Sequence, residues 1–199
     1  PIEVKILPSM DNIVNGVVSI DNIKHVEVAD ILGRDSVSPD KRLLERNIRD
    51  KNILITGAGG SIGSELSRQI MKLCPKKVIL MDNSEYNLYN IHFELAAQQS
   101  IVEVIPSLCT VTNYYQLKQI IIENNIETIY HAAAYKHVPM VEKNIVSGVY
   151  NNVIGTYNVA RLADELKVKN MVLVSSDKAV RPTNVMGASK RMSELVLQA

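Results

Sequence analysis

The chain has 199 residues, 46% of them hydrophobic, which is enough to bury the core of one or two domains. Its 22 basic and 21 acidic residues give a net charge of +1 and are scattered, so nucleic acid is not an expected partner. No apolar run has the length of a membrane span and no signal peptide is visible, so we expect no membrane contact within these residues. Because the chain begins at Pro1 and ends inside a predicted helix, we expect it to be part of a longer protein.

The cysteine and histidine residues show no metal-binding pattern. Cys74 and Cys109 are far apart and lack CxxC spacing, so we expect buried or bystander thiols in a reducing cytosol. No group of histidine, cysteine and carboxylate residues has the spacing of metal ligands, so we expect no metal site.

Residues 1–50 differ in character from the rest and are predicted to form an N-terminal extension or linker from an upstream region. Short strands are indicated at 3–7, 17–20 and 25–28, with a turn at 15–16, connecting loops at 31–35 and 38–40, and a charged helix at 41–50.

Residues 51–199 alternate between strand and helix patterns, which predicts an α/β fold with a Rossmann-like, doubly wound parallel sheet. The predicted strands are 52–56, 77–81, 101–105, 127–130 and 171–174. The predicted helices are 62–73, 85–99, 113–124, one long helix within 138–167, and one beginning near Lys190.

Three glycines, Gly57, Gly60 and Gly63, lie between the first of these strands and its helix. The first allows a tight turn, the second lets the backbone approach a pyrophosphate, and the third lets the helix pack on the strand. Ser61 and Ile62 would present backbone N–H groups and a partial positive charge to that anion. This spacing predicts a dinucleotide site.

Asp82 ends the second strand, where a carboxylate binds the hydroxyls of an adenosine ribose and repels a 2′-phosphate. Neither Asn83 nor Ser84 is an arginine, so we expect NAD rather than NADP as the cofactor. The alternative is that Asp82 only caps the next helix, a role that Asn83 or Ser84 could also fill.

The fourth strand is followed by small residues. Ala132, Ala133 and Ala134 would let a flat ring or a ribose lie against the backbone, although simple packing under a helix explains them too. His131 is expected to be a strand-end histidine with satisfied hydrogen bonds rather than a metal ligand.

Next to these alanines, we predict that Tyr135, Lys136 and His137 meet the substrate. The two basic residues are placed to contact a substrate phosphate, but an exposed basic loop is the simpler interpretation.

The fifth strand, predicted to be buried, leads into a polar segment at 175–190. Ser176, Asp177 and Lys178 follow the strand end, where open α/β sheets bind their ligands. Met186 and Lys190 are four residues apart, so they share a face of the following helix. Taken alone, the segment could equally be a polar loop that caps this helix.

These motifs resemble the extended short-chain dehydrogenases/reductases. Residues 130–142 and 176–190 are similar to the bacterial polysaccharide-biosynthesis branch, which contains large, membrane-anchored UDP-N-acetylglucosamine 4,6-dehydratases. The similarity covers most of residues 30–199, including a connector at 30–35. It implies an NAD-dependent lyase on a UDP-sugar, a homo-oligomer, and a cytoplasmic domain of a bacterial inner-membrane protein.

In such enzymes NAD takes a hydride from sugar C4, the C5 proton and the C6 hydroxyl leave, and the hydride returns to C6. The resemblance implies Asp177 as the acid at C6, Lys178 as the base at C5, and Lys190 as the residue that holds the nicotinamide ribose. It also assigns Asn184, with the loop after the fourth strand, to the substrate.

The sequence departs from the wider superfamily at two positions. Met186 replaces the usual tyrosine base, as it does in the large dehydratases, so Ser176 is predicted to orient the C4 hydroxyl while Lys190 or Lys178 helps remove its proton. Thr110 stands where many relatives place an aspartate that meets the adenine amine.

Two alternatives stay open at this point. One is a nucleotide-sugar epimerase, which shares the oxidised C4 intermediate. The other is a non-catalytic dinucleotide-binding fragment.

Overall fold

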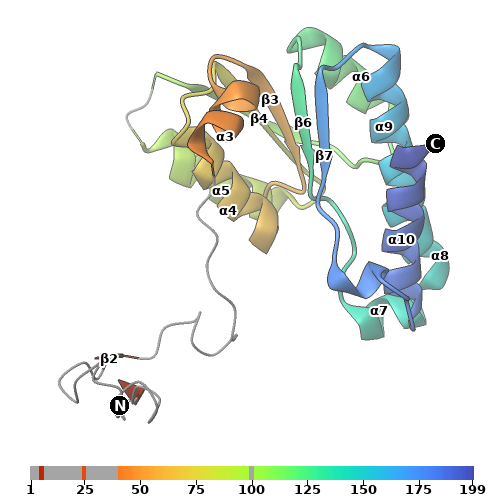
Figure 1. Cartoon of the computed structure of the whole chain (residues 1–199). Coiled ribbons are helices and arrows are strands. Elements are labelled where there is room, and N and C mark those ends of the chain that lie inside the picture. The colour runs from red at the N-terminus through yellow and green to blue at the C-terminus, as the bar shows by residue number, and fades with distance from the viewer. Residues whose placement is uncertain (1–4, 7–23, 26–39, 99–100) are drawn as a thin grey trace. The chain divides into compact units, whose positions relative to one another are not determined.

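The computed structural model describes residues 5–6, 24–25, 40–98 and 101–199 (Figure 1). The chain divides into two compact units, residues 1–40 and 41–199. In the first unit, β1 (Lys5–Ile6) pairs antiparallel with β2 (Lys24–His25). The predicted strands at 3–7 and 25–28 are therefore described only in part. The following predictions lie outside the described residues: the turn at 15–16, the strand at 17–20, the connector at 30–35 and the loop at 38–39.

The second unit is built on a parallel sheet, as the sequence predicts. Its strands are β3 (Asn52–Thr56), β4 (Lys77–Asp82), β5 (Glu103–Leu108), β6 (Thr128–His131) and β7 (Asn170–Leu173). Their order in the sheet is β5-β4-β3-β6-β7, so the chain runs outward in one direction from β3 and then returns to the other side. This reversal next to β3 creates the crevice in which doubly wound folds bind ligands.

Helices cover both faces of this sheet (Figure 1). They are α3 (Lys41–Ile48), α4 (Ser61–Met71), α5 (Glu85–Ala96), α6 (Tyr114–Glu123), α7 (Val138–Lys143), α8 (Ile145–Val149), the π-helix η2 (Tyr150–Ile154), α9 (Gly155–Glu165), the 3₁₀-helix η3 (Asp177–Ala179) and α10 (Val185–Gln198). Among the described residues, no helix is both long and apolar enough to cross a membrane.

Two buried clusters form the core, one on each face. Along β3, successive side chains point to opposite faces, so Ile53 joins one cluster with Ile70 of α4, while Leu54 joins the other with Leu117 of α6 and Val159 of α9. All five side chains are at most 1% exposed. A strand that is buried on both faces reads as a continuous apolar run, which is why the sequence predicts β3 at its observed bounds.

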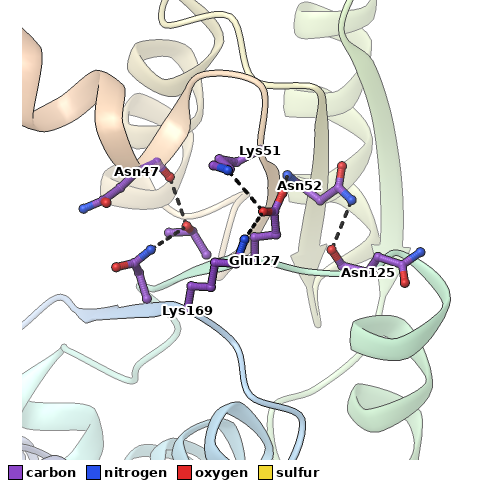
Figure 2. A network of polar contacts seen from close by, with 8 residues as sticks. Asn47, Lys51, Asn52, Asn125, Glu127 and Lys169 are labelled. Carbon is purple, nitrogen blue, oxygen red and sulfur yellow. Dashed lines mark hydrogen bonds and ion pairs between the residues drawn. The ribbon is translucent and has the colours of Figure 1, made fainter.

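A polar network fixes the amino ends of the central strands (Figure 2). The Glu127 carboxylate accepts hydrogen bonds from Lys169 Nζ at 2.9 Å, Lys51 Nζ at 3.3 Å and the backbone N–H of Asn52 at 3.3 Å. Burial raises the pKa of Glu127, but these three hydrogen bonds outweigh it and lower the pKa overall. Glu127 itself precedes β6, and its partners lie at the starts of β3 and β7, the strands on either side of β6. The carboxylate therefore connects the starts of three adjacent strands.

Helix α3 is docked at this same end of the sheet. The Thr128 hydroxyl donates to the carbonyl oxygen of Asn47 at 2.9 Å, and the Ile48 side chain is buried in the core beside β3. The compact unit thus starts at Lys41, before the predicted domain start at Lys51.

The prediction of one long helix within 138–167 is wrong, because the structure has several shorter helices there. The chain leaves helical geometry at Asn144, whose φ is −135° and ψ is 54°, and resumes as α8, η2 and α9. The Asn144 side chain donates to the carbonyl oxygen of Met140 at 2.9 Å, the kind of side chain–backbone bond that competes with helix continuation.

The prediction of a buried fifth strand is also wrong. Strand β7 is parallel to β6, but it has no second neighbour among the described residues, and its Val172 side chain is 43% exposed. An apolar run identifies a strand without revealing whether a further element covers it.

Five non-glycine residues of the described chain have positive φ. Asp50, Cys74, Asn125 and Lys167 each stand between a helix and the next strand, where left-handed residues commonly end helices. Arg181, with φ of 51°, is the exception, because it lies in the loop between η3 and α10.

Candidate functional site

The glycine loop adopts the geometry that its sequence predicts. Gly57 has φ of +68°, and a Cβ there would lie 2.7 Å from the backbone of Ala133. At Gly63 a Cβ would lie 1.9 Å from the carbonyl oxygen of Gly57, so only glycine lets α4 pack this closely on the loop. At Gly60 a Cβ would lie 3.3 Å from the same oxygen, a tight contact but not an overlap.

This loop borders a pocket of about 200 Å³ at the carboxyl ends of β3, β4 and β6, which we call the glycine-loop pocket. The predicted residues that line it are Gly57, Gly60, Asp82, Asn83, Ser84, Ala132, Ala133, Ala134 and Tyr135. Ser61, Ile62 and Gly63 begin α4 and are not in the lining; Ile62 is 51% exposed.

Asp82 is nearly buried and ties the glycine loop to the start of α5. Its Oδ2 accepts from the backbone N–H of Gly59 and its Oδ1 from that of Ser84, both at 2.9 Å. Ser84 itself caps α5 by accepting from the N–H of Asn87 at 3.4 Å, so the helix cap does not depend on Asp82. Each carboxylate oxygen has a second lone pair, which leaves acceptors for ribose hydroxyls.

His131 is the satisfied strand-end histidine that the sequence predicts. Its Nδ1 lies 2.6 Å from the Thr56 hydroxyl and its Nε2 lies 3.0 Å from the Thr156 hydroxyl. Complete burial, with a smaller contribution from the charge on Lys190, lowers the pKa of His131 to about 3. The ring is therefore a neutral cross-link between β3, β6 and α9.

Lys136 reaches the glycine loop. Its Nζ donates to the Ser61 hydroxyl at 2.8 Å, so the lysine spans from the loop after β6 to the first residue of α4. The ammonium therefore lies beside the N-terminus of α4, and contact of Lys136 with a substrate phosphate stays a prediction. His137 is the N-cap residue of α7, and its side chain is exposed.

A second pocket adjoins the first, with Ala134 and Tyr135 in both linings. It has a volume of about 430 Å³ and is lined by Ala134, Tyr135, Lys136, His137, Met140, Val141, Asn144, Ser147 and Gly148. Three of the four predicted substrate residues are therefore together. The fourth, Asn184, is not in this lining, and its side-chain oxygen caps α10 by accepting from the N–H of Gly187 at 2.8 Å.

The predicted catalytic residues Ser176, Asp177 and Lys178 form one exposed cluster after β7. The Ser176 hydroxyl donates to Asp177 Oδ1 at 3.1 Å, and Lys178 Nζ lies 3.5 Å from the same oxygen. The hydrogen bond from Ser176, followed by the charge of Lys178, lowers the pKa of Asp177. This arrangement holds Asp177 as a carboxylate, whereas a general acid needs a proton.

Met186 and Lys190 share a face of α10, as their spacing predicts, and the structure shows that this face is buried. Their exposed fractions are 3% and 7%, and Lys190 Nζ donates to the carbonyl oxygen of Val174 at 2.7 Å. Burial lowers the pKa of Lys190, and the charge of Glu194 partly opposes this. Neither residue lines the glycine-loop pocket, but the Val174 contact joins Lys190 to the strand end just before Ser176.

Sequence reasoning missed several residues of the glycine-loop pocket, namely Met81, Asn87, Cys109, Val111 and Asn151. The buried polar pair Asn151 and Asn152 inside a helical stretch is a signal that could have been used. Asn152 holds the Tyr135 backbone through hydrogen bonds of 2.7 and 3.0 Å.

Thr110 also lines the glycine-loop pocket, where its hydroxyl lies 2.9 Å from that of Thr112. Beside it, burial raises the pKa of the Cys109 thiol to about 11, whereas Cys74 is exposed. Across the part of the chain that the structure describes, no three histidine, cysteine or carboxylate residues form a metal-binding group.

Comparison with curated proteins finds relatives that are named for polysaccharide biosynthesis or as nucleotide-sugar dehydratases and epimerases. It is 44% identical over 194 residues to "Capsular polysaccharide biosynthesis protein CapD" of Staphylococcus aureus, covering 97% of this chain and 32% of that protein. It is 31% identical over 150 residues to a UDP-N-acetylglucosamine 4,6-dehydratase (inverting) of Campylobacter jejuni, covering 75% and 43%. A UDP-glucose 4-epimerase of Rickettsia canadensis is 34% identical over 150 residues, with 73% and 42% covered.

Solved structures have the same fold. Pen from Bacillus thuringiensis is 33% identical with a TM-score of 0.68, covering 75% of this chain and 46% of that one. DesIV, a dTDP-glucose 4,6-dehydratase from Streptomyces venezuelae solved with NAD and TYD bound, is 24% identical with a TM-score of 0.64, covering 73% and 50%.

The chain spans a third to a half of the length of these relatives. The family described as "Polysaccharide biosynthesis protein" matches residues 53–199, which include the parallel sheet from the second residue of β3 onward and the two pockets described above. The chain therefore belongs to the polysaccharide biosynthesis protein family, within the extended short-chain dehydrogenase/reductase-like fold.

Proposed function

We propose that this chain forms the NAD-binding part of a nucleotide-sugar 4,6-dehydratase. Its substrate would be UDP-N-acetylglucosamine and its product a UDP-4-keto-6-deoxy sugar for surface polysaccharide synthesis. The observation that carries the proposal is the position of Ser176, Asp177 and Lys178 after β7, at the same edge of the sheet as the glycine-loop pocket. Lys190 donates to the carbonyl oxygen of Val174, two residues before Ser176.

The glycine-loop pocket fits NAD. The backbone at Gly60 and the N-terminus of α4 suit a pyrophosphate, and the alanines after β6 leave room for a flat ring. Asp82 keeps lone pairs for ribose hydroxyls and would repel a 2′-phosphate. NAD in the related DesIV structure supports the same choice.

NAD, when bound, would accept the hydride from sugar C4 and return it at C6. Lys178 would take the C5 proton and Asp177 would give a proton to the leaving C6 hydroxyl. In the exposed cluster the pair is charged, with 3.5 Å between Lys178 Nζ and Asp177 Oδ1. A substrate that covers both groups would desolvate them, which disfavours both charges, so the proton would move from Lys178 to Asp177 and prepare base and acid together.

The C4 hydroxyl needs a different base, because the buried Met186 thioether accepts no proton. We assign orientation of this hydroxyl to Ser176, whose Oγ donates to Asp177 Oδ1 and accepts from the backbone N–H of Lys178. Lys190 or Lys178 would help to remove the proton of the C4 hydroxyl. The second pocket, with Tyr135, Lys136 and His137, would receive part of the UDP-sugar.

Incubation of the natural gene product with UDP-N-acetylglucosamine in D₂O tests the reaction. The expected product is a 4-keto-6-deoxy sugar that carries deuterium at C5. Absence of such a product would refute the dehydratase assignment. The appearance of the C4 epimer instead would support an epimerase, which is the activity named for the Rickettsia relative.

The resemblance to membrane-anchored dehydratases extends the proposal to location. We propose a homo-oligomer whose described part works on the cytoplasmic side of a bacterial inner membrane. Fractionation of cells that express the natural gene product tests this. Recovery of the protein outside the membrane fraction would contradict it.

A further inference from the structure

Glu194 joins α10 to the residue before the predicted catalytic cluster. The Ser175 hydroxyl donates to Glu194 Oε1 at 2.5 Å, and Arg191 Nη1 pairs with Glu194 Oε2 at 2.8 Å. Glu194 follows Lys190 by four residues, so the two lie one above the other on the helix. Two successive turns of α10 are thus bonded to Val174 and Ser175, the residues that lead into Ser176.

Electrostatics connect the same residues. The Lys190 amine is almost fully buried, and burial disfavours its charge. Glu194 is the one anion that opposes this effect among the described residues. The other titratable group coupled to Lys190 is His131 on β6, which is neutral because its pKa is about 3.

We propose that Glu194 is a positioning residue for Lys190. Its carboxylate fixes this turn of α10 against Ser175 and partly opposes the effect of burial on the Lys190 amine. The inference rests on the proposed function and on the contact with the nicotinamide ribose that the family resemblance implies for Lys190. The exposed ion pair between Glu194 and Arg191 would by itself contribute little to stability. The two effects of Glu194 to be separated are therefore its hydrogen bond with Ser175 and the effect of its charge on Lys190.

Three variants separate them. Glu194→Gln keeps an acceptor for Ser175 but removes the charge, whereas Ser175→Ala keeps the charge and removes the hydrogen bond. Glu165→Gln is the matched control, because Glu165 on α9 also accepts from a hydroxyl, that of Tyr114 at 2.6 Å, and pairs with Arg161 at 2.8 Å. Glu165 does not act on the Lys190 amine.

The first measurement is a pH titration of lysine ε-¹³C signals by NMR in the natural gene product. The Lys190 signal is identified by its loss in Lys190→Met. Removing the anion destabilises the ammonium, so Glu194→Gln should lower the pKa of Lys190, while Glu165→Gln should leave it unchanged. An unchanged pKa in Glu194→Gln, or an equal fall in Glu165→Gln, would overturn the proposal.

The second measurement is the pH dependence of kcat for dehydration. The part of the pH profile of kcat that depends on the ionisation of Lys190 should move to lower pH in Glu194→Gln. Ser175→Ala should lower kcat about three- to tenfold without moving that part of the profile. If the pH profile of kcat for Glu194→Gln stays in place although its NMR titration shows a shifted pKa for Lys190, the role of Glu194 in catalysis is refuted. The NMR titration needs no turnover, so a wild-type protein without dehydratase activity would refute the proposed function and leave the result on Glu194 standing.

Discussion

The Nζ of Lys136 lies 2.8 Å from the hydroxyl of Ser61, so a residue of the loop after β6 reaches the first residue of α4. This contact places an ammonium at the helix N-terminus beside the glycine loop. The helix dipole and the lysine charge would both attract a bound pyrophosphate.

We therefore expect Lys136→Met to raise the Kd for NAD roughly tenfold, as loss of one charge-assisted hydrogen bond does. Calorimetric titration with NAD measures this. Lys143→Met, at the exposed end of α7, is the control and should bind NAD normally. An unchanged Kd for NAD with a raised KM for the UDP-sugar would show that Lys136 serves the substrate, as its sequence position suggested.

Gly63 and Gly60 should respond differently to alanine. At Gly63 the new Cβ would lie 1.9 Å from the carbonyl oxygen of Gly57, so α4 must move, and we expect a loss of about 2–4 kcal/mol in the free energy of unfolding. At Gly60 the nearest atom, the Gly57 carbonyl oxygen, is 3.3 Å away, a tight contact but not an overlap, so the loss of stability should be smaller than at Gly63 while NAD binding weakens. Urea denaturation and NAD titration of both variants decide this; equal stability losses would contradict it.

His131 should make stability depend on pH. Its pKa is about 3 in the folded protein, whereas the ordinary value is 6.5. Between these two pH values the unfolded chain therefore binds a proton at His131 and the folded protein does not. The contribution of the neutral ring is fully present above pH 6.5 and is lost as pH falls toward 3, by up to about 1.4 kcal/mol per pH unit.

His131→Gln removes this titration while retaining hydrogen-bonding atoms. The variant is expected to be less stable at pH 7, yet to lose less stability than the wild type between pH 6.5 and pH 4.5. Urea denaturation across this range measures the slope. Parallel slopes for the two proteins would mean that other groups cause the pH dependence.

Asp177 and Lys178 should affect separate steps of the proposed reaction. Lys178→Met should abolish deuterium exchange at sugar C5, and Asp177→Asn should slow loss of the C6 hydroxyl by about 10²- to 10³-fold. Mass spectrometry of the sugar recovered from D₂O follows both steps. Asp164→Asn is the control, because Asp164 of α9 forms a comparable exposed pair with Lys167, which follows that helix. Full deuterium exchange at C5 in Lys178→Met would show that Lys178 is not the base at this position.

The sequence alone predicts much of the fold because local rules act strongly in it. Strand β3 is an uninterrupted apolar run, Gly57 must adopt a positive φ, and Asn113 caps α6 with its own side chain. Prediction from the sequence fails for features that depend on contacts between residues far apart in the chain. Nothing local indicates that Val172 would be 43% exposed, since the sequence does not say which element covers a strand.

The candidate site divides in the same way. Residue type and spacing alone determined the glycine loop, Asp82 at a strand end, and the shared face of Met186 and Lys190, because each depends on the period of one helix or strand. Only the tertiary structure decided that Lys136 reaches Ser61 and that Glu194 bonds Ser175, because these partners are brought together by the sheet and not by the chain.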